Sequence, residues 1–367
     1  MTDVVVYYHD PVKAPLVRDA VLPALAAATR VAGVSGHLER HWLHGPHVRI
    51  RLHGPVDAQA AAAASAAAVL REYVRTNPSI VDIPPHELLS HAHETAIAEL
   101  LQPPYEPFHT NNSVRIEPAD TRRILDLLGS DVLVELRATG LRLGVPAIEA
   151  SLAEFRNTSQ DRVRLAVTAM AVHAGRYPPG LANGYHSFLS HVEDFLLASD
   201  AGGRIRSRFG QVWADNAESV TEAVRRVAGG HPTTEAEAAW QSWTIGTRLA
   251  TERVFDAGEL SSAPNPRYGE RAHEIGDPGA IERYDYAERT NFSSYHTKLW
   301  DVDLDHPLIR RPLAVYRFGT NVLYQLLAVC DVTPMERYLA ASLVAAATQR
   351  LTGISWDQHL SALAGLR

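Results

Sequence analysis

The sequence predicts an α+β fold in which a small N-terminal ferredoxin-like α/β sandwich precedes a mostly helical body with two long functional loops. Strand-like and helix-like patterns alternate at the start of the chain, helical periodicity dominates from Pro118 onward, and two stretches rich in Gly and Pro interrupt these patterns. We therefore expect a β-α-β-β-α sandwich over residues 1–80, a connecting loop segment over 81–118, and a mainly helical region over 119–367 that contains a loop over 261–291. Loops of this length in a compact protein are more often functional than accidental.

Each element of the sandwich has its own sequence signal. Val4–Tyr8 is a run of β-branched and aromatic residues, which predicts a strand, and apolar residues at helical spacing follow it. Residues 36–42 and 47–52 flank a Gly-Pro turn and predict a pair of short strands. Asp57 is a suitable N-cap for an alanine-rich helix over residues 58–73.

The second strand of this pair alternates between apolar and basic residues. Val48, Ile50 and Leu52 face one way, and the other face carries His47, Arg49 and Arg51. A pair of guanidinium groups aimed into a cleft would suit carboxylate or amide oxygens. The alternative is a polar face exposed to solvent.

The helical body is predicted from apolar residues that recur at helical spacing. The expected helices cover residues 120–128, 148–154, 159–173, 185–197, 214–227, 235–257, 312–329, 334–351 and 356–366. In and just after the second loop, Tyr284, Tyr286 and Tyr295 cluster with His296. This aromatic group is either functional or part of the packing of the loop.

Composition and charge exclude several classes of protein. Hydrophobic residues make up 46% and charged residues 21% of the chain, which is typical of globular proteins. A net charge of -7 argues against a nucleic-acid binder, which normally has a basic face. A single cysteine, Cys330, excludes a disulfide framework and a cysteine-based metal cluster. Because the sequence shows no signal peptide and no membrane span, we expect a cytoplasmic protein.

Motifs for nucleotides, metals and serine hydrolases are absent from the sequence. There is no Walker loop, no G-x-G-x-x-G after a strand and no G-x-S-x-G. His86 and His91 resemble a zincin pair but have one residue too many between them, and His93 adds no helical ligand spacing. We therefore expect no metal and no cofactor, and interpret these histidines as exposed surface residues.

Three arginines at alternate positions form a further charge pattern. Arg204, Arg206 and Arg208 are suited to grip an acidic peptide. The start of a solvated helix is the favoured interpretation of the same residues.

Four segments resemble one family of peptide-modifying enzymes. They are the strand Val5–Asp10, the phrase Trp42-x-x-Gly45-Pro46-His47-x-Arg49-x-Arg51, the turn Tyr105-Glu106-Pro107 and the stretch Ser342–Arg350. Together they look like the glutamate-elimination domains of lanthipeptide dehydratases and their relatives in thiopeptide biosynthesis. The resemblance runs the length of the chain, and its second segment is the most specific.

The chain departs from the elimination domains where their chemistry depends on particular residues. Their closing helix has a histidine where this chain has Ala345, and an asparagine where it has Gln349. A β-elimination needs a base that removes the Cα proton. The opening strand and the Arg40-His41-Trp42 phrase look more like a sister branch, the thiopeptide pyridine synthases. That resemblance implies a formal aza-[4+2] cycloaddition of two dehydroalanines, with loss of water and leader peptide, which forms a pyridine-centred macrocycle.

Chemical type and position then single out two groups of residues for this reaction. The expected substrate-binding residues are Arg49, Arg51, His47, Trp42, Tyr286 and Arg350. The expected catalytic residues are Tyr295 and His296 as proton donors, with Ser293 and Glu106 in support. The expected partner is a precursor peptide made of a leader and a dehydrated core, and other enzymes of the same pathway are further candidates. Neither nucleic acid nor membrane is an expected partner.

Two other functions stay open from the sequence. The chain could be a stand-alone glutamate-elimination lyase that works with a separate glutamylating enzyme to make dehydroalanine. It could also be a non-catalytic scaffold that binds a leader peptide and presents it to other enzymes. The three functions differ in the mass change of the peptide, because elimination releases glutamate, cycloaddition releases water and leader, and a scaffold releases nothing.

Overall fold

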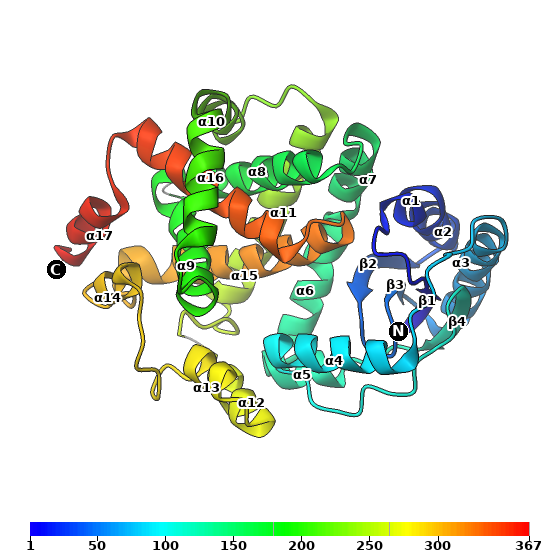
Figure 1. The fold of residues 1–367 in the computed structure, drawn as a ribbon. Coiled ribbons are helices and arrows are strands. Elements are labelled where there is room, and N and C mark those ends of the chain that lie inside the picture. The colour runs from blue at the N-terminus through cyan, green and yellow to red at the C-terminus, as the bar shows by residue number, and fades with distance from the viewer. Residues whose placement is uncertain (179, 264, 367) are drawn as a thin grey trace. The chain divides into compact units, whose positions relative to one another are not determined.

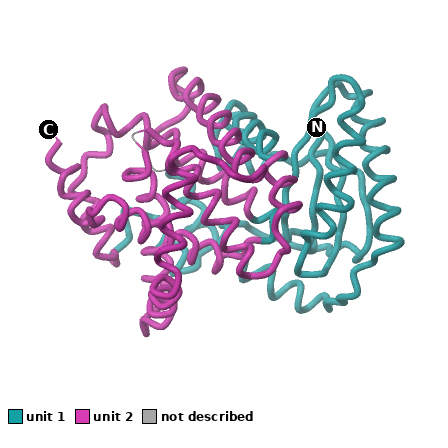
Figure 2. The backbone as a smooth tube through the Cα atoms, turned by 90° about the horizontal axis from the view of Figure 1, so that it is seen from above, with its two compact units in different colours: residues 1–145, 265–290, 328–331 teal, residues 146–264, 291–327, 332–367 magenta. Residues whose placement is uncertain are grey.

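The computed structural model describes residues 1–178, 180–263 and 265–366, and its elements are labelled in Figure 1. The chain forms two compact units, drawn in different colours in Figure 2. Unit 1 comprises residues 1–145, 265–290 and 328–331, and unit 2 comprises residues 146–264, 291–327 and 332–367. Most of the described residues are helical, with one small antiparallel sheet near the N-terminus, so the predicted α+β class is confirmed.

The sheet of unit 1 has four strands in the order β2-β3-β1-β4, and each neighbouring pair is antiparallel. The bounds of its strands are β1 Thr2–Tyr7, β2 Ser35–His41, β3 His47–His53 and β4 Ser113–Pro118. The three predicted strands are confirmed. The tight turn between β2 and β3 depends on Gly45, whose φ of 111° would strain any residue with a Cβ.

The segment 81–118, expected to be a loop, contains regular structure instead. Helix α4 spans Pro85–Glu99, and β4 adds an edge strand to the sheet through pairing with β1. In β4, Val114 and Ile116 alternate with Ser113 and charged residues, a period of two that was the available sequence signal. Its side chains are half-buried or exposed, so the strand lacks the apolar run that marks β1.

One face of the sheet is apolar and carries the core of unit 1. Strand residues Val4, Val6, Val48 and Ile50 have no exposed surface. Helices α2, Leu22–Thr29, and α3, Val56–Thr76, pack on this face after the short α1, Ala14–Leu16, and the π-helix Val17–Val21. The side of α3 toward the sheet is mostly alanine, which lets the helix approach the strands closely.

Besides α4, the described part of unit 1 contains four helices outside this sandwich. Their bounds are α5 Arg122–Leu128, α6 Asp131–Leu143, α12 Arg267–Ile275 and α13 Pro278–Tyr284. Helices α12 and α13 lie within residues 261–291, which we expected to be a loop throughout, so that expectation was wrong for these two stretches. Arg271 helps to hold α12 in place, because its guanidinium donates to Asp126 of α5 at 2.6 and 3.0 Å.

Unit 2 is built from helices, two of which extend a residue or two beyond its bounds. They are α7 Val145–Glu154, α8 Ser159–Arg176, α9 Leu181–Ser199, α10 Arg204–Ala228, α11 Glu235–Asp256, α14 Ser294–Leu299, α15 Pro307–Val329, α16 Pro334–Thr352 and α17 Trp356–Ala364. All but α14 were predicted, and α10 begins at Arg204 rather than at Ala214. This start confirms the helical interpretation of the arginine run.

Side-chain caps fix several of these helix starts. Thr333 accepts from the backbone N–H of Glu336, and the Glu336 carboxylate accepts in return from the Thr333 N–H, which is a capping box. Ser355 and Gln358 form the same arrangement at the start of α17. The caps therefore follow from a Ser or Thr placed three residues before Glu or Gln.

Close packing of α8 against α9 leads to a prediction about Gly184. A Cβ at this position would lie 2.7 Å from Cα of Ala174, so the two backbones would have to separate. We expect Gly184→Ala to lower the free energy of unfolding by about 1–3 kcal/mol or more. At Gly210 of α10 an added Cβ would meet no atom within 4 Å. Gly210→Ala should therefore raise the free energy of unfolding by about 0.5–1 kcal/mol. Urea unfolding of the two variants tests the contrast, and equal effects would contradict it.

The buried His173 of α8 leads to a prediction about pH. Its Nε2 lies 3.2 Å from the Thr320 hydroxyl, its ring stacks on Tyr316, and burial lowers its pKa to about 3. In the unfolded chain a histidine binds its proton at a pKa of about 6.5, so its stabilising contribution is complete above that pH. As the pH falls from about 6.5 toward about 3, stability should drop by about 1.4 kcal/mol per pH unit from this group.

Urea unfolding at several pH values checks this expectation. His173→Gln should flatten the dependence below pH about 6.5. The matched control is His231→Gln, which replaces an exposed histidine of the same unit and should leave the slope unchanged. Identical slopes for the two variants would show that His173 is protonated in the folded protein.

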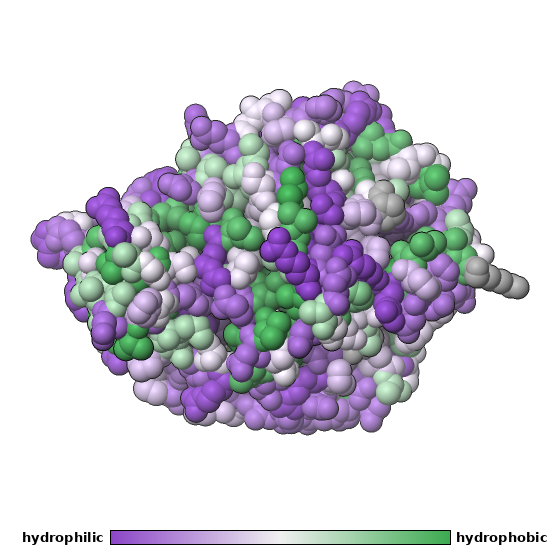
Figure 3. Space-filling view, turned by 180° about the vertical axis from the view of Figure 1, so that it is seen from behind, coloured by the Kyte–Doolittle hydropathy of each residue, from purple (hydrophilic) through white to green (hydrophobic). Residues whose placement is uncertain are grey.

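No helix among the described residues is long and apolar enough to cross a membrane. On the face drawn in Figure 3, hydrophobic residues form small groups among hydrophilic ones.

Candidate active site

Unit 2 contains a polar cluster inside its helical packing, and the cluster includes three of the residues expected to be catalytic. Ser293 precedes α14, and its hydroxyl accepts from the backbone N–H of His296 at 3.3 Å. This cap starts the short helix that carries Tyr295 and His296. The structure therefore brings Ser293, Tyr295 and His296 together, as their closeness in sequence requires, and it adds partners from α9 and α17.

Tyr295 is the first member of a chain of hydrogen bonds between three helices. Its side chain is 1% exposed, and its hydroxyl lies 3.1 Å from Nδ1 and 3.2 Å from the backbone oxygen of His186 on α9. Nε2 of His186 lies 2.7 Å from Nδ1 of His359 on α17. We call Tyr295, His186 and His359 the tyrosine relay.

Burial sets the protonation states along the tyrosine relay. It raises the pKa of Tyr295 above its ordinary value, so the phenol keeps its proton at neutral pH. Burial, reinforced by the neighbouring His359, lowers the pKa of His186 to about 3, and burial also lowers the pKa of His359. Both imidazoles are then neutral at pH 7, with one donor and one acceptor nitrogen each. A neutral chain of this kind moves a proton by a shift of tautomers, without placing a net charge in the core.

His296 bridges two serine hydroxyls beside the relay. Its Nδ1 lies 2.8 Å from Oγ of Ser293, and its Nε2 lies 2.9 Å from Oγ of Ser190 on α9. In neutral imidazole one of these nitrogens donates and the other accepts. Because His296 is half-buried, this bridge links the two serine hydroxyls to the solvent-accessible side of the cluster.

An apolar core surrounds Tyr295. Its buried members are Tyr185, Leu189, Tyr295, Val302, Ala345 and Leu360. Ala345 is the position at which the sequence resemblance has a histidine, so a methyl group stands in the packing where that side chain would be. Gln349, the other departure, accepts from the N–H of Trp356 at 3.0 Å and so joins α16 to the start of α17. Gln349 has a structural contact that positions the helix of His359.

The two arginines of β3 lie in unit 1, on the polar face of the sheet. Arg51 forms a bidentate ion pair with Asp3, at 2.8 and 2.6 Å, and both side chains are buried. The register pairs Asp3 of β1 directly with Arg51, which makes this a cross-strand pair. The buried pair leaves Arg51 little capacity for a substrate carboxylate or amide.

Arg49 is paired in the same way with β2. Its Nε donates to Glu39 at 2.8 Å, and Glu39 lies directly opposite it in the register. Arg137 of α6 donates to the other oxygen of Glu39 at 2.7 Å, and His37 lies 3.1 Å from that oxygen. Burial disfavours the charge on Glu39, but Arg137 and Arg49 hold the pKa of this carboxyl well below its ordinary value. The Arg49 side chain keeps 19% of its surface exposed, against 4% for Arg51.

His47 and Trp42 lie near the turn between β2 and β3. His47 is 4% exposed, its Nδ1 lies 2.9 Å from the Gly45 oxygen, and burial lowers its pKa to about 3. The half-buried Trp42 donates from Nε1 to Glu99 at 2.8 Å and meets Tyr105 edge-on. The structure thus brings Arg49, His47 and Trp42 to the β2–β3 hairpin, but it places each of them in contacts within unit 1.

Glu106, Tyr286 and Arg350 are exposed. Glu106 and Tyr286 belong to unit 1, and Arg350 is at the end of α16 in unit 2. The tyrosine relay lies wholly within unit 2, so Tyr286 and Tyr295 belong to different units although they are close in sequence. The supporting catalytic role of Glu106 and the substrate contacts of Tyr286 and Arg350 stay predictions.

Sequence analysis missed His186, Ser190 and His359. His186 and Ser190 are four residues apart on a predicted helix, which places them on the same face. That spacing was the available signal for the first two. His359 had no signal of its own, because only the packing of α17 brings it to His186.

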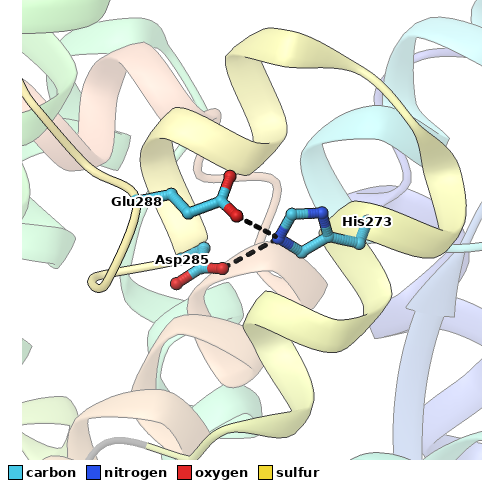
Figure 4. Close-up of side chains that lie close together, drawn as sticks. All are labelled: His273, Asp285 and Glu288. Atoms are coloured by element: carbon cyan, nitrogen blue, oxygen red, sulfur yellow. Dashed lines mark hydrogen bonds and ion pairs between the residues drawn. The ribbon is translucent and has the colours of Figure 1, made fainter.

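A second polar group lies in unit 1. Nε2 of His273 is 2.8 Å from Oδ2 of Asp285 and 3.9 Å from Oε1 of Glu288, as Figure 4 shows. The three ligand atoms are close enough together to hold a metal ion. Their side chains are 43%, 21% and 62% exposed, and ion pairs at a surface account for the contacts.

Comparisons with known proteins extend this description. No protein-family model matches the sequence, and no curated protein matches it either. Among solved structures, the fold is similar to that of the pyridine synthase TbtD from thiomuracin biosynthesis, with a TM-score of 0.70, 21% identity, and coverage of 96% of this chain and 99% of that chain. TsrL is similar over 100% of this chain and 99% of its own, with a TM-score of 0.63 and 16% identity.

A third solved structure extends the similarity to a larger protein. The tRNA-dependent lantibiotic dehydratase MibB from Microbispora sp. 107891 matches 96% of this chain with 28% of its own length, at a TM-score of 0.50 and 12% identity. The resemblance found in the sequence is thereby confirmed for the fold: this chain has the fold of a pyridine synthase, which a lantibiotic dehydratase shares over part of its length.

Proposed function

We propose that this protein is a pyridine synthase of thiopeptide biosynthesis. It joins two dehydroalanines of a precursor peptide by a formal aza-[4+2] cycloaddition and releases water and the leader peptide, leaving a pyridine in a macrocycle. The observation that carries the proposal is the tyrosine relay: a buried phenol that keeps its proton, backed by two neutral imidazoles, in a chain with the fold of a pyridine synthase.

The reaction needs holding and proton transfer more than covalent catalysis. An amide tautomerises to its iminol, which supplies the C=N of the azadiene, and the second dehydroalanine supplies the alkene. Closing a loop of about ten residues has an entropic cost of a few kcal/mol, which a site that folds the core peptide offsets. Holding the two alkenes together is worth at most about 7–11 kcal/mol.

The tyrosine relay is suited to the proton transfers. The cycloadduct loses its hydroxyl as water and the leader as an amide, and each departure takes one proton to the leaving group while the ring loses one. Tyr295 donates to a leaving group, and His186 and His359 restore its proton. His296, with Ser293 and Ser190, is assigned to carry the proton that the ring loses.

Residues of unit 1 complete the proposal as peptide contacts. Arg49, the more exposed arginine of β3, is assigned to peptide oxygens, and Trp42 and His47 lie on the same hairpin. Arg51 is assigned a positioning role through Asp3. On the strength of exposure and chemical type, Tyr286 and Arg350 remain proposed peptide contacts, and Glu106 remains a proposed supporting catalytic residue.

Mass spectrometry of a peptide with a leader and two dehydroalanines tests the function. The expected result is loss of water and leader with one macrocyclic product. Loss of glutamate from a glutamylated peptide would instead identify an elimination lyase, a function that the methyl group of Ala345 disfavours because it cannot act as a base. Saturable peptide binding without any mass change would identify a scaffold.

We also propose two finer features of the protein. The order β2-β3-β1-β4, with α2 and α3 on one face, supports a ferredoxin-like sandwich with β4 as its fourth strand. The single buried cysteine, Cys330, supports work in the reducing cytoplasm, where a ribosomal precursor peptide is made.

A further inference from the structure

Unit 2 has a groove between α10 and the start of α16, and none of the residues that line it belongs to the tyrosine relay. Its volume is about 350 Å³. Ile205 and Phe209 of α10, and Met335 and Leu339 of α16, line it with apolar side chains. In each helix the two residues are four positions apart, so they form a row along one face. The groove is therefore an apolar strip between two helices.

The apolar strip is open to solvent. Met335 is 46% exposed, and Ile205 and Leu339 are half-buried. Burial of apolar surface contributes about 25 cal/mol per Å², so covering these side chains would be favourable. Exposed apolar rows of this kind bind helices whose own apolar side chains have the same spacing.

Two arginines define the charge of the groove. Arg204 and Arg208 line it, are exposed, and form no ion pair with any residue in the part of the chain that the structure describes. Arg206, between them in sequence, is different, because it forms a bidentate pair with Glu193 at 2.9 and 2.8 Å. In a chain of net charge -7, two unpaired guanidinium groups beside an apolar strip are complementary to an acidic ligand.

The ends of the two helices near the groove already have carboxylate partners. Asp200 accepts from the backbone N–H groups of Ile205 and Arg206 at the start of α10, and Glu336 accepts from the N–H of Thr333 at the start of α16. The charge offered to a ligand is therefore that of Arg204 and Arg208. A nucleic acid would use the charge but not the apolar strip, so the combination favours a peptide with apolar residues on one face and acidic residues beside them.

We propose that this groove binds an acidic, amphipathic helical segment of the leader of the precursor peptide. The inference rests on the proposed function for the identity of the peptide, and on the groove alone for the chemistry of recognition. Apolar side chains of the leader lie along Ile205, Phe209, Met335 and Leu339, while its carboxylates pair with Arg204 and Arg208. The leader is then held by a surface that contains none of the proposed catalytic residues.

Binding of a designed peptide to the full-length protein tests the groove. The probe is a fluorescein-labelled peptide of about 16 residues with Leu at helical spacing and Glu on the flanks, and its counterpart has Lys in place of Glu. Fluorescence anisotropy should show saturable binding of the Glu peptide and little binding of the Lys peptide. Arg204→Glu/Arg208→Glu should weaken binding of the Glu peptide by about tenfold or more and strengthen binding of the Lys peptide.

Two controls make the result specific. Arg71→Glu reverses an exposed arginine on α3 in unit 1 and should bind the Glu peptide as the unaltered protein does. Met335→Ser removes apolar surface without a change of charge and should weaken the Glu peptide. Circular dichroism of each variant confirms that it is folded.

Several outcomes would overturn the assignment of the groove as a binding site for an acidic peptide. They are equal binding of the Glu and Lys peptides, unchanged binding in the charge-reversed variant, and displacement of the Glu peptide by an RNA oligonucleotide that binds more tightly. Because anisotropy detects binding without turnover, a failure here leaves the mass-spectrometric test of pyridine formation unaffected. A protein that forms no pyridine but binds the Glu peptide through these arginines would overturn the proposed function and leave the groove as a peptide site.

Discussion

Tyr295→Phe is expected to fold as the unaltered protein does and to form pyridine about 10²- to 10⁴-fold more slowly. The substitution removes one hydroxyl and keeps the ring that packs with Tyr185, Leu189 and Ala345 in the core of unit 2. The deleted hydroxyl is the group assigned to donate a proton to the substrate. It is also the end of the hydrogen-bonded chain that runs through His186 to His359. Mass spectrometry of the leader-bearing bis-dehydroalanine peptide measures the loss of rate.

Tyr185→Phe is the matched control for this variant. Tyr185 belongs to the same buried core, and its hydroxyl has no hydrogen-bond partner among the described residues. Its removal should leave the rate within about twofold, since no proton path depends on it. Equal losses in the two variants would mean that packing, not proton donation, explains the effect. Full activity of Tyr295→Phe would remove this residue from the mechanism.

The histidines of the relay call for a different measurement, because they act through Tyr295. His186→Gln and His359→Gln keep hydrogen-bonding groups at both positions but cannot exchange tautomers. They should change the dependence of kcat on pH, since protonation of a neutral imidazole would no longer interrupt the chain. Loss of rate with an unchanged pH profile would indicate a structural role alone.

The sequence predicted the strands and helices that have strong local signals. The valines of β1, the alternation in β3 and the capping-box pattern at Thr333 each determine their element within a few residues. Strand β4 and helix α12 were missed because they are short, and because pairing with β1 stabilises the strand and ion pairs to Asp126 stabilise the helix.

The candidate site was predictable only in part, for a related reason. Ser293, Tyr295 and His296 stand together in the sequence, so chemical type and position were enough to select them. His359 joins them through its hydrogen bond with His186. These two residues are 173 positions apart in the chain, so no local pattern encodes their contact. The alternation of β3 likewise placed Arg49 and Arg51 on one face, but it could not reveal that Glu39 and Asp3 lie opposite them in the register.

Those registers predict that the two arginines of β3 differ in their effect on stability. Arg51→Ala is expected to lower the free energy of unfolding by about 3–5 kcal/mol, because it leaves the Asp3 carboxylate buried without its partner. Urea unfolding measures the loss, and Asp3→Asn/Arg51→Ala should recover part of it, since the double variant has no unpaired buried charge. A stable Arg51→Ala would contradict the structural role of the pair.

Arg49→Ala should behave differently, since Glu39 keeps two partners. Arg137 still donates to this carboxylate at 2.7 Å, and His37 remains 3.1 Å from it. We expect a stability loss of about 1–2 kcal/mol, smaller than for Arg51→Ala, together with abolished macrocycle formation, because the half-buried guanidinium is the one assigned to the peptide. Arg49→Lys should restore stability more than activity, because an ammonium cannot form two parallel hydrogen bonds. Unaltered conversion of the peptide by Arg49→Ala would show that the polar face of the sheet holds the fold of unit 1 together and takes no part in binding the substrate.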